Sequence, residues 1–150
     1  HFVNNEANDH DECPQMAMER INGAIFFGAV DHVQNSLMEI DEKNPQKKTV
    51  LVVAGGINFI DAAGAELLAQ EARRRHARGG GLWFHGLREG AAAMLAKEPF
   101  ASDIGRDACF TEKRDAIAGI YARLDKDVCA KCSKRIFEEC GKVSPAPPAA

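Results

Sequence analysis

Apolar and polar residues alternate at helical spacing in the first third of the chain. The apolar positions are separated by three, four and three residues, namely Val30, Val33, Leu37 and Ile40. Charged and amide side chains fill the positions between them, so the pattern predicts an amphipathic helix that begins near Ala29 and stops at Asn44-Pro45. Three further helices are predicted at about residues 64–78, at 89–97, and around Ile117, Ile120, Tyr121 and Leu124.

Short apolar runs between these helices predict strands at residues 16–21, 24–27, 49–54, 82–85 and 108–110. The run at 49–54 is unbroken and rich in β-branched residues, which is typical of a sheet centre covered on both faces. Asn22-Gly23 separates the first two runs. It predicts a hairpin, because both central positions of a type I′ turn need positive φ.

The order of these elements predicts an α/β fold in one domain, with a central mixed β-sheet and crossover α-helices. This domain is expected over residues 15–125. Residues 1–14 are polar and acidic, which predicts a flexible lead-in or linker. Residues 126–150 are expected to form a cysteine-containing C-terminal extension that ends in a Pro/Ala tail.

Composition narrows the classes of function. Lys and Arg number 19 against 22 Asp and Glu, a net charge of -3, so no nucleic-acid partner is expected. The apolar runs are far shorter than the roughly 18 residues of a membrane span, and the polar, acidic start does not resemble a signal peptide. The five cysteines are an odd number, which favours reduced thiols in the cytosol. No nucleophile elbow, zinc-protease motif or phosphate loop is present, and we therefore expect neither an enzyme nor a cofactor.

The most informative segment is the connection at residues 55–64, between the central strand and the second helix. Open α/β sheets place functional loops at such carboxyl ends of strands. Asp61 is the expected N-cap, because its carboxylate can accept hydrogen bonds from the free amides of the first turn. An Asp at this position is most often only a cap, so a functional role depends on where the loop lies.

Three motifs in this order resemble the STAS domain: Ile25-Phe26-Phe27-Gly28, Asn58-Phe59-Ile60-Asp61-Ala62-Ala63-Gly64, and Phe110-Thr111 ahead of Asp115-Ala116-Ile117. The form with Phe-Phe-Gly is similar to the STAS domains that end SulP sulfate and anion transporters. The resemblance covers about residues 15–125 and implies the STAS fold, which anti-sigma factor antagonists share.

This resemblance implies a regulatory, protein-interaction domain on the cytoplasmic side of the inner (plasma) membrane. Its expected partner is the transmembrane domain of the same transporter chain. A soluble protein partner and a homodimer formed through the parent transporter remain open. The expected partner and regulatory loop consists of Asn58, Phe59, Asp61, Ala62, Ala63 and Gly64.

Stand-alone antagonists of the same family carry a phosphorylated serine or threonine two residues after the Asp. The matching residue here is Ala63, and Ala62 precedes it, so neither position offers a hydroxyl. This departure favours the transporter domain. The alternative is a stand-alone antagonist-like binding module that lacks the phosphorylatable serine.

A third alternative is a metal or redox module in the cysteine tail. Cys129 and Cys132 form a Cys-x-x-Cys zinc half-site, and Cys140 follows eight residues later. The fourth ligand would be Cys13, a histidine or a residue of a second chain. One continuous helix would instead place the three tail cysteines with Ile136 on one apolar face. We prefer that interpretation and expect no metal.

The second helix ends in a basic cluster, Arg73-Arg74-Arg75-His76-Ala77-Arg78. Arginines near a helix C-terminus interact favourably with the helix dipole and usually stay in solvent. The cluster is therefore predicted to form a solvated surface, with contact to anionic lipid headgroups as an alternative.

Overall fold

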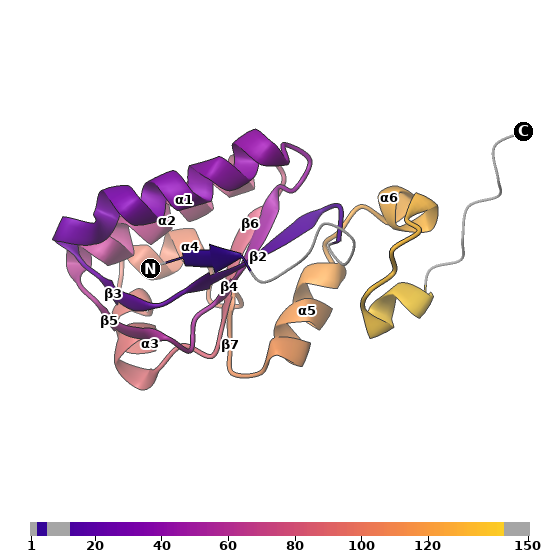
Figure 1. Ribbon diagram of the computed structural model, residues 1–150. Helices are drawn as coiled ribbons and strands as arrows, with labels where there is room; N and C mark the ends of the chain where they lie inside the picture. Colours follow the sequence, from indigo (N-terminus) through magenta and orange to yellow (C-terminus); the bar gives the residue numbers. More distant parts are fainter. Residues whose placement is uncertain (1–2, 6–12, 143–150) are drawn as a thin grey trace, which may run out of the picture.

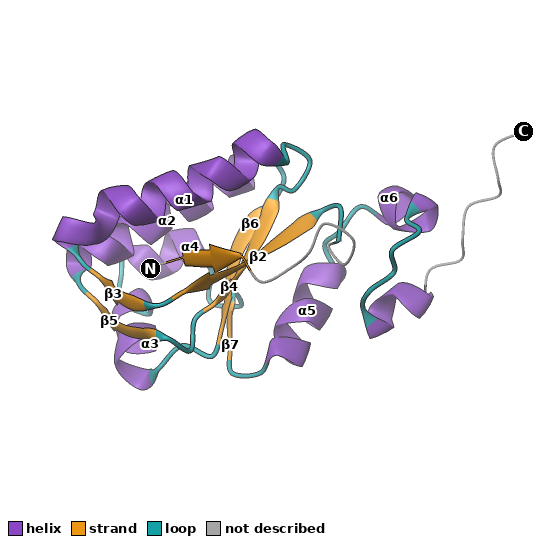
Figure 2. Cartoon of the chain, viewed as in Figure 1, coloured by secondary structure: helices purple, strands orange, loops and turns teal. Residues whose placement is uncertain are grey.

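The computed structural model describes residues 3–5 and 13–142 (Figure 1). Its main sheet has five strands, in the spatial order β1 (Val3–Asn5), β2 (Met16–Ile21), β4 (Thr49–Val53), β6 (Gly81–His85) and β7 (Cys109–Phe110). β1 pairs antiparallel with β2, and all the other neighbours are parallel. The predicted α/β class and mixed sheet are confirmed, as the strands and helices of Figure 2 show.

A second, two-stranded sheet consists of β3 (Gly23–Ile25) and β5 (Ile57–Ile60), paired in parallel. The predicted hairpin at Asn22-Gly23 is therefore wrong. Gly23 does adopt a positive φ of 90°, but its N–H donates to the carbonyl of Gly56. The Asn-Gly step thus redirects the chain from one sheet to the other and does not reverse it.

The helices are η1 (Phe27–Ala29), α1 (Val30–Lys43), α2 (Ala62–Ala77), α3 (Glu89–Leu95), α4 (Phe100–Ile104), α5 (Lys113–Tyr121), α6 (Lys126–Lys131) and η2 (Glu138–Lys142). α1 and α2 cover one face of the main sheet and α5 lies against the other (Figure 1). None of the described helices is long and apolar enough to cross a bilayer.

Both faces of β4 are buried, as the unbroken apolar run predicted. Val50 and Val52 pack into the larger core beneath α1 and α2, whereas Leu51 points into a smaller core on the α5 side. The neighbouring β6 divides in the same way. Its Trp83 faces α5 and stacks on Phe110, with ring centroids 5.8 Å apart.

The N-terminal segment is more structured than predicted. Val3–Asn5 forms β1, and Cys13 is buried, so the expectation of a flexible lead-in is wrong for these residues. Residues 1–2 and 6–12 lie outside the described part of the chain, as do residues 143–150 of the predicted Pro/Ala tail.

Candidate partner-binding surface

The predicted loop at residues 58–64 lies at the junction of β5 and α2. Strand β5 supplies Asn58 and Phe59, whose side chains are exposed while those of Ile57 and Ile60 are buried. The sequence placed these residues in an irregular connection. It missed the strand because only its first and last residues are buried, which is not the alternation of a half-buried strand.

Asp61 is the N-cap of α2, as predicted. Its backbone is extended, and Oδ1 accepts a hydrogen bond of 2.8 Å from the N–H of Gly64. The other oxygen, Oδ2, accepts a second bond of 3.1 Å from the N–H of Phe27. Because of this cap the helix begins at Ala62, two residues earlier than predicted.

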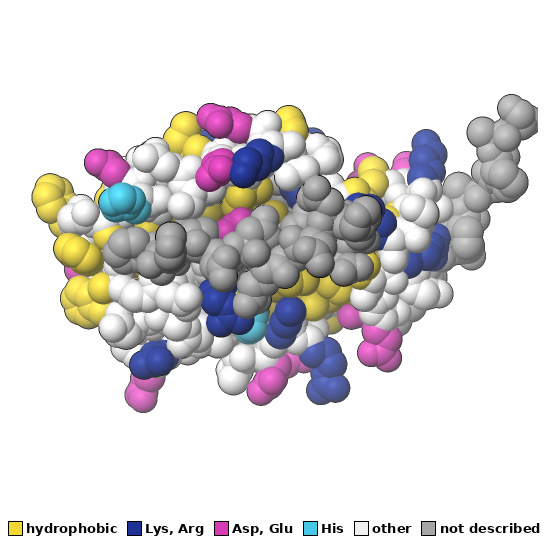
Figure 3. Space-filling view, in the orientation of Figure 1, with side chains coloured by type: hydrophobic (Ala, Val, Ile, Leu, Met, Phe, Trp, Pro, Cys, Tyr) yellow, Lys and Arg dark blue, Asp and Glu magenta, His cyan; other side chains and the backbone are white. Residues whose placement is uncertain are grey.

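Three aromatic side chains project around this cap. Phe27 is 81% exposed, Phe59 is 52% exposed and Phe26 is 41% exposed. Phe26 directly follows β3, which pairs with β5 at Ile25–Ile60, and the N–H of Phe27 contacts Asp61. We call Phe26, Phe27, Phe59 and Asp61 the aromatic surface. Hydrophobic side chains protrude at this end of the molecule (left edge of Figure 3), where Figure 1 places β3 and β5.

The sequence did not identify Phe26 and Phe27 as surface residues. They were predicted to continue a strand, which would have buried one of the two. The strand ends at Ile25, however, and both rings lie outside the core. Two adjacent exposed aromatic residues beside a glycine are the pattern that could have indicated a contact surface.

Small residues begin α2 for a packing reason. A Cβ on Gly64 would lie 2.2 Å from the carbonyl oxygen of Ile25, so only glycine lets the helix start approach β3 this closely. Ala62 is exposed and Ala63 is partly exposed. The helix start therefore offers methyl groups and backbone to a partner, and no hydroxyl.

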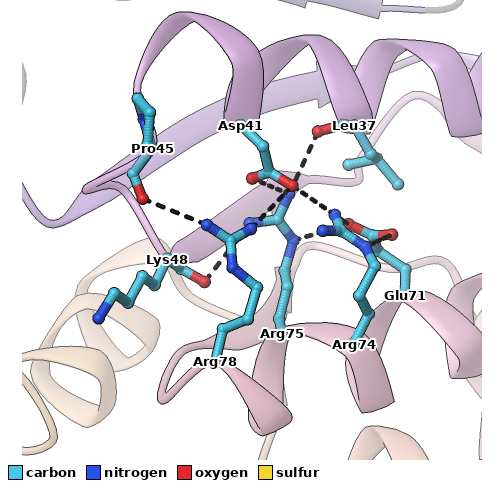
Figure 4. Close-up of polar contacts among 8 residues, drawn as sticks. All are labelled: Leu37, Asp41, Pro45, Lys48, Glu71, Arg74, Arg75 and Arg78. Carbon is cyan, nitrogen blue, oxygen red and sulfur yellow. Dashed lines mark hydrogen bonds and ion pairs between the residues drawn. The ribbon is translucent and has the colours of Figure 1, made fainter.

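The arginines at the end of α2 form an ion-pair network around one buried member, Arg75, as Figure 4 shows. The predicted solvated surface is wrong for Arg75, whereas Arg73 and His76 are exposed as predicted. Arg75 is fully buried. Its Nε donates to Glu71 at 2.8 Å, and its Nη2 lies 3.2 Å from Asp41 on α1. Nη2 also donates to the carbonyl of Leu37 at 3.2 Å.

Asp41 is the centre of this network. Besides Arg75, its carboxylate pairs with Arg74 at 2.6 Å and with Arg78 at 3.0 Å. Burial lowers the pKa of Arg75, and the nearby Glu71 and Asp41 carboxylates oppose that shift. Arg73, on the outer face of α2, pairs with Glu66 and Asp103. Arg74, Arg75 and Arg78 therefore join α1 to α2 through Asp41. The alternative of contact with anionic lipid stays a prediction.

The cysteine tail does not form the continuous helix that we preferred. α6 ends at Lys131, and Cys132 has an extended backbone. Cys140 lies in the separate turn η2, while Cys129 is buried. All five cysteines are free. Within the described ranges, no three His, Cys, Asp or Glu side chains are arranged to hold a metal ion.

Comparison with known proteins agrees with this architecture. Residues 6–116 match the family model of the STAS domain. A protein of Bacillus subtilis named as a sulfate transporter, YvdB, is 29% identical over 108 residues, which are 72% of this chain and 20% of that protein. The chain thus spans about a fifth of the length of this relative.

Solved structures show the same fold. A sulfate transporter family protein from Wolinella succinogenes superposes with a TM-score of 0.61 at 23% identity, over 77% of this chain and 98% of that one. The unphosphorylated anti-sigma factor antagonist SpoIIAA gives a TM-score of 0.61 at 12% identity, over 82% and 99% of the two chains. The likeness to an anti-sigma factor antagonist predicted for the fold is confirmed.

Proposed function

This chain belongs to the STAS domain family, and we propose that it is the regulatory, protein-binding domain of a SulP-type transporter of sulfate or another inorganic anion. Its action is on the cytoplasmic side of the membrane and is not enzymatic. The sulfate transporters among its relatives support this proposal. The transport step itself would belong to a membrane part. In YvdB, about four fifths of the protein lies outside the region that matches this chain and is long enough to contain such a part.

The observation that carries the proposal is the aromatic surface. Phe27 and Phe59 are more than half exposed to solvent, and a cluster of large exposed apolar side chains is typical of a protein contact surface. The backbone beneath them is fixed by Asp61, which bonds both Phe27 and Gly64. A preorganised aromatic surface loses little conformational entropy when a partner covers it.

The partner that we propose is the transmembrane domain of the same transporter chain. A soluble protein or a second copy of the domain could contact the same aromatic side chains. The antagonist-like alternative gains nothing at this surface, because Ala62 and Ala63 give a kinase no hydroxyl where α2 begins. Regulation here would act through occupancy of the surface and not through phosphate on these residues.

The test uses the full-length protein that carries this chain. Phe27→Asp and Phe59→Asp each place a charge on the aromatic surface, and Met38→Asp is the matched control, since Met38 is 45% exposed on α1 outside that surface. We expect the two Phe variants to reduce sulfate uptake several-fold at equal protein level, while Met38→Asp transports like wild type. Equal uptake in all three would refute the role of this surface, and a coding sequence without membrane spans would refute the transporter assignment.

A further inference from the structure

Four cysteines from distant parts of the sequence surround one small cavity. Its volume is about 10 Å³, and it is lined by Cys13, Pro14, Gln15, Leu124, Cys129, Cys132, Arg135 and Cys140. α6 and η2 lie at the end of the molecule opposite to β3 and β5 (Figure 1), so this cysteine cluster is separate from the aromatic surface. A cavity of this size has room for about one water-sized particle.

Gln15 brings Cys13 to the tail. Its side chain forms two hydrogen bonds with the backbone of Asp125, accepting from N–H at 2.9 Å and donating to the carbonyl at 3.0 Å. Its Nε2 also donates to Sγ of Cys129 at 3.4 Å. Residues 110 positions apart are thereby fixed next to one another, and Cys13 becomes the fourth thiol that the tail motif lacked.

Arg135 forms hydrogen bonds with the backbone of the other three cysteines. Its guanidinium donates to the carbonyls of Cys140 at 2.9 Å, Cys132 at 3.1 Å and Cys129 at 3.4 Å. The same residue has a positive φ of 40°, which is uncommon for a residue with a side chain. A fixed cation therefore lies beside four thiols, where it would offset the negative charge of thiolates.

The tail buries little apolar surface. Cys129 is the one buried residue among residues 126–141, Phe137 packs only partly buried against the smaller core, and Val128 and Ile136 are 38% and 37% exposed. Small irregular segments with so little core often depend on a disulfide or a structural metal. Cysteine patterns of intracellular proteins more often bind metal than form disulfides.

We propose that Cys13, Cys129, Cys132 and Cys140 bind one zinc ion. The Cys-x-x-Cys pair supplies two ligands, and Cys13 and Cys140 complete a tetrahedral four-thiolate set. Each thiol gives up its proton to solvent and its sulfur lone pair to the ion, so Zn²⁺ with four thiols yields a complex of charge -2 and four protons. Since the described residues show no three ligands already in metal-binding geometry, the thiols close around the ion on binding.

The test starts from the reduced, chelator-treated chain of residues 1–150, titrated with Zn²⁺ or with Co²⁺ as a spectroscopic probe. We expect about one ion per chain and, for Co²⁺, the thiolate charge-transfer and tetrahedral ligand-field bands. Alkylation mapped by mass spectrometry gives a readout without mutation. Zinc should slow modification of the four clustered cysteines but not of the exposed Cys109, which lies on β7.

Cys13→Ser and Cys109→Ser are the matched variants. Cys13→Ser should weaken zinc binding at least tenfold, whereas Cys109→Ser should bind like wild type. Unchanged affinity in Cys13→Ser would overturn the four-cysteine site. So would a reduced wild-type chain that takes up less than about 0.2 equivalents of zinc, or a disulfide within the cluster that forms while zinc is in excess.

Discussion

The N–H of Phe27 donates to Oδ2 of Asp61, whose Oδ1 accepts from Gly64 at the start of α2. One carboxylate thus serves as a helix cap and as a fixed point for Phe27, the most exposed aromatic residue in the described part of the chain. The sequence predicted the first bond but not the second, because Phe27 is 34 positions away. This relationship connects the stability of α2 to the geometry of the aromatic surface.

Asp61→Ala removes both acceptors. We expect the free energy of unfolding to fall by about 1–2 kcal/mol, since a lost N-cap costs about 1 kcal/mol and the N–H of Phe27 loses its partner as well. Asp61→Asn keeps one carbonyl oxygen and should lose about half as much. Urea unfolding measures both. Asp107→Ala, in an exposed loop, is the control, and equal stability of Asp61→Ala and wild type would contradict the cap.

Gly64→Ala tests the close approach of α2 to β3. The added Cβ would lie 2.2 Å from the carbonyl oxygen of Ile25, so the backbone must shift, and we expect a loss of about 2–4 kcal/mol. Gly90→Ala is the matched control in α3, because its Cβ would meet nothing within 4 Å. That variant should gain up to about 1 kcal/mol of stability. Thermal or urea unfolding measures the stability of both variants. An equal change in the two would contradict a close approach of α2 to β3 at Gly64.

Local patterns predicted most of the main sheet and its helices, because the spacing of apolar residues indicates which of them are buried. A spacing of two indicates one face of a strand, as for Val50 and Val52, and a spacing of four indicates one face of a helix, as for Val33 and Leu37. They failed where tertiary contacts decide. Gly23 has the positive φ of a hairpin turn, yet its N–H bonds to Gly56 and leads into a second sheet. Nothing within a few residues of Asn22 encodes that partner.

Arg75→Ala tests the ion-pair network between α1 and α2. Removing this fully buried guanidinium leaves a cavity between the helices, takes one ion-pair partner from Glu71 and one from Asp41, and leaves the carbonyl of Leu37 without its donor. We therefore expect a loss of about 3–5 kcal/mol, although Arg74 still pairs with both carboxylates. Arg73→Ala, on the exposed side of the same helix, should lose less than about 1 kcal/mol. Chemical unfolding at low and high salt separates them, since screening should reduce the small effect more than the large one. A loss below about 1 kcal/mol for Arg75→Ala would show that the network contributes little.

The candidate sites also depend on contacts between residues far apart in the sequence, which local patterns do not predict. Charge density and dipole arguments predicted solvated arginines, because Asp41, the residue that pairs with three of them, lies on a different helix. The loop around Asp61 was predicted from its place after a central strand. Phe26 and Phe27 joined it only in three dimensions, as Cys13 joined the tail cysteines.

Zinc binding should weaken as the pH falls. Burial raises the pKa of the Cys13 and Cys129 thiols, so both are protonated near neutrality and Zn²⁺ must displace their protons. Each displaced proton changes the apparent Kd by about tenfold per pH unit, and we therefore expect at least a tenfold loss between about pH 7.5 and pH 6.5. Competition with a zinc chelator of known pH dependence measures it. A pH-independent Kd would mean that thiols are not the ligands.

Gln15 stands directly before β2, a strand inside the main sheet, and it is bonded to Asp125 and Cys129 near the C-terminal end of the domain. The start of β2 is therefore held in two ways, by its ladder with β4 inside the sheet and by the Gln15 side chain that reaches the tail. Unfolding of α6 would take away the partners of Gln15, so the stability of the C-terminal extension and that of the sheet are thermodynamically coupled.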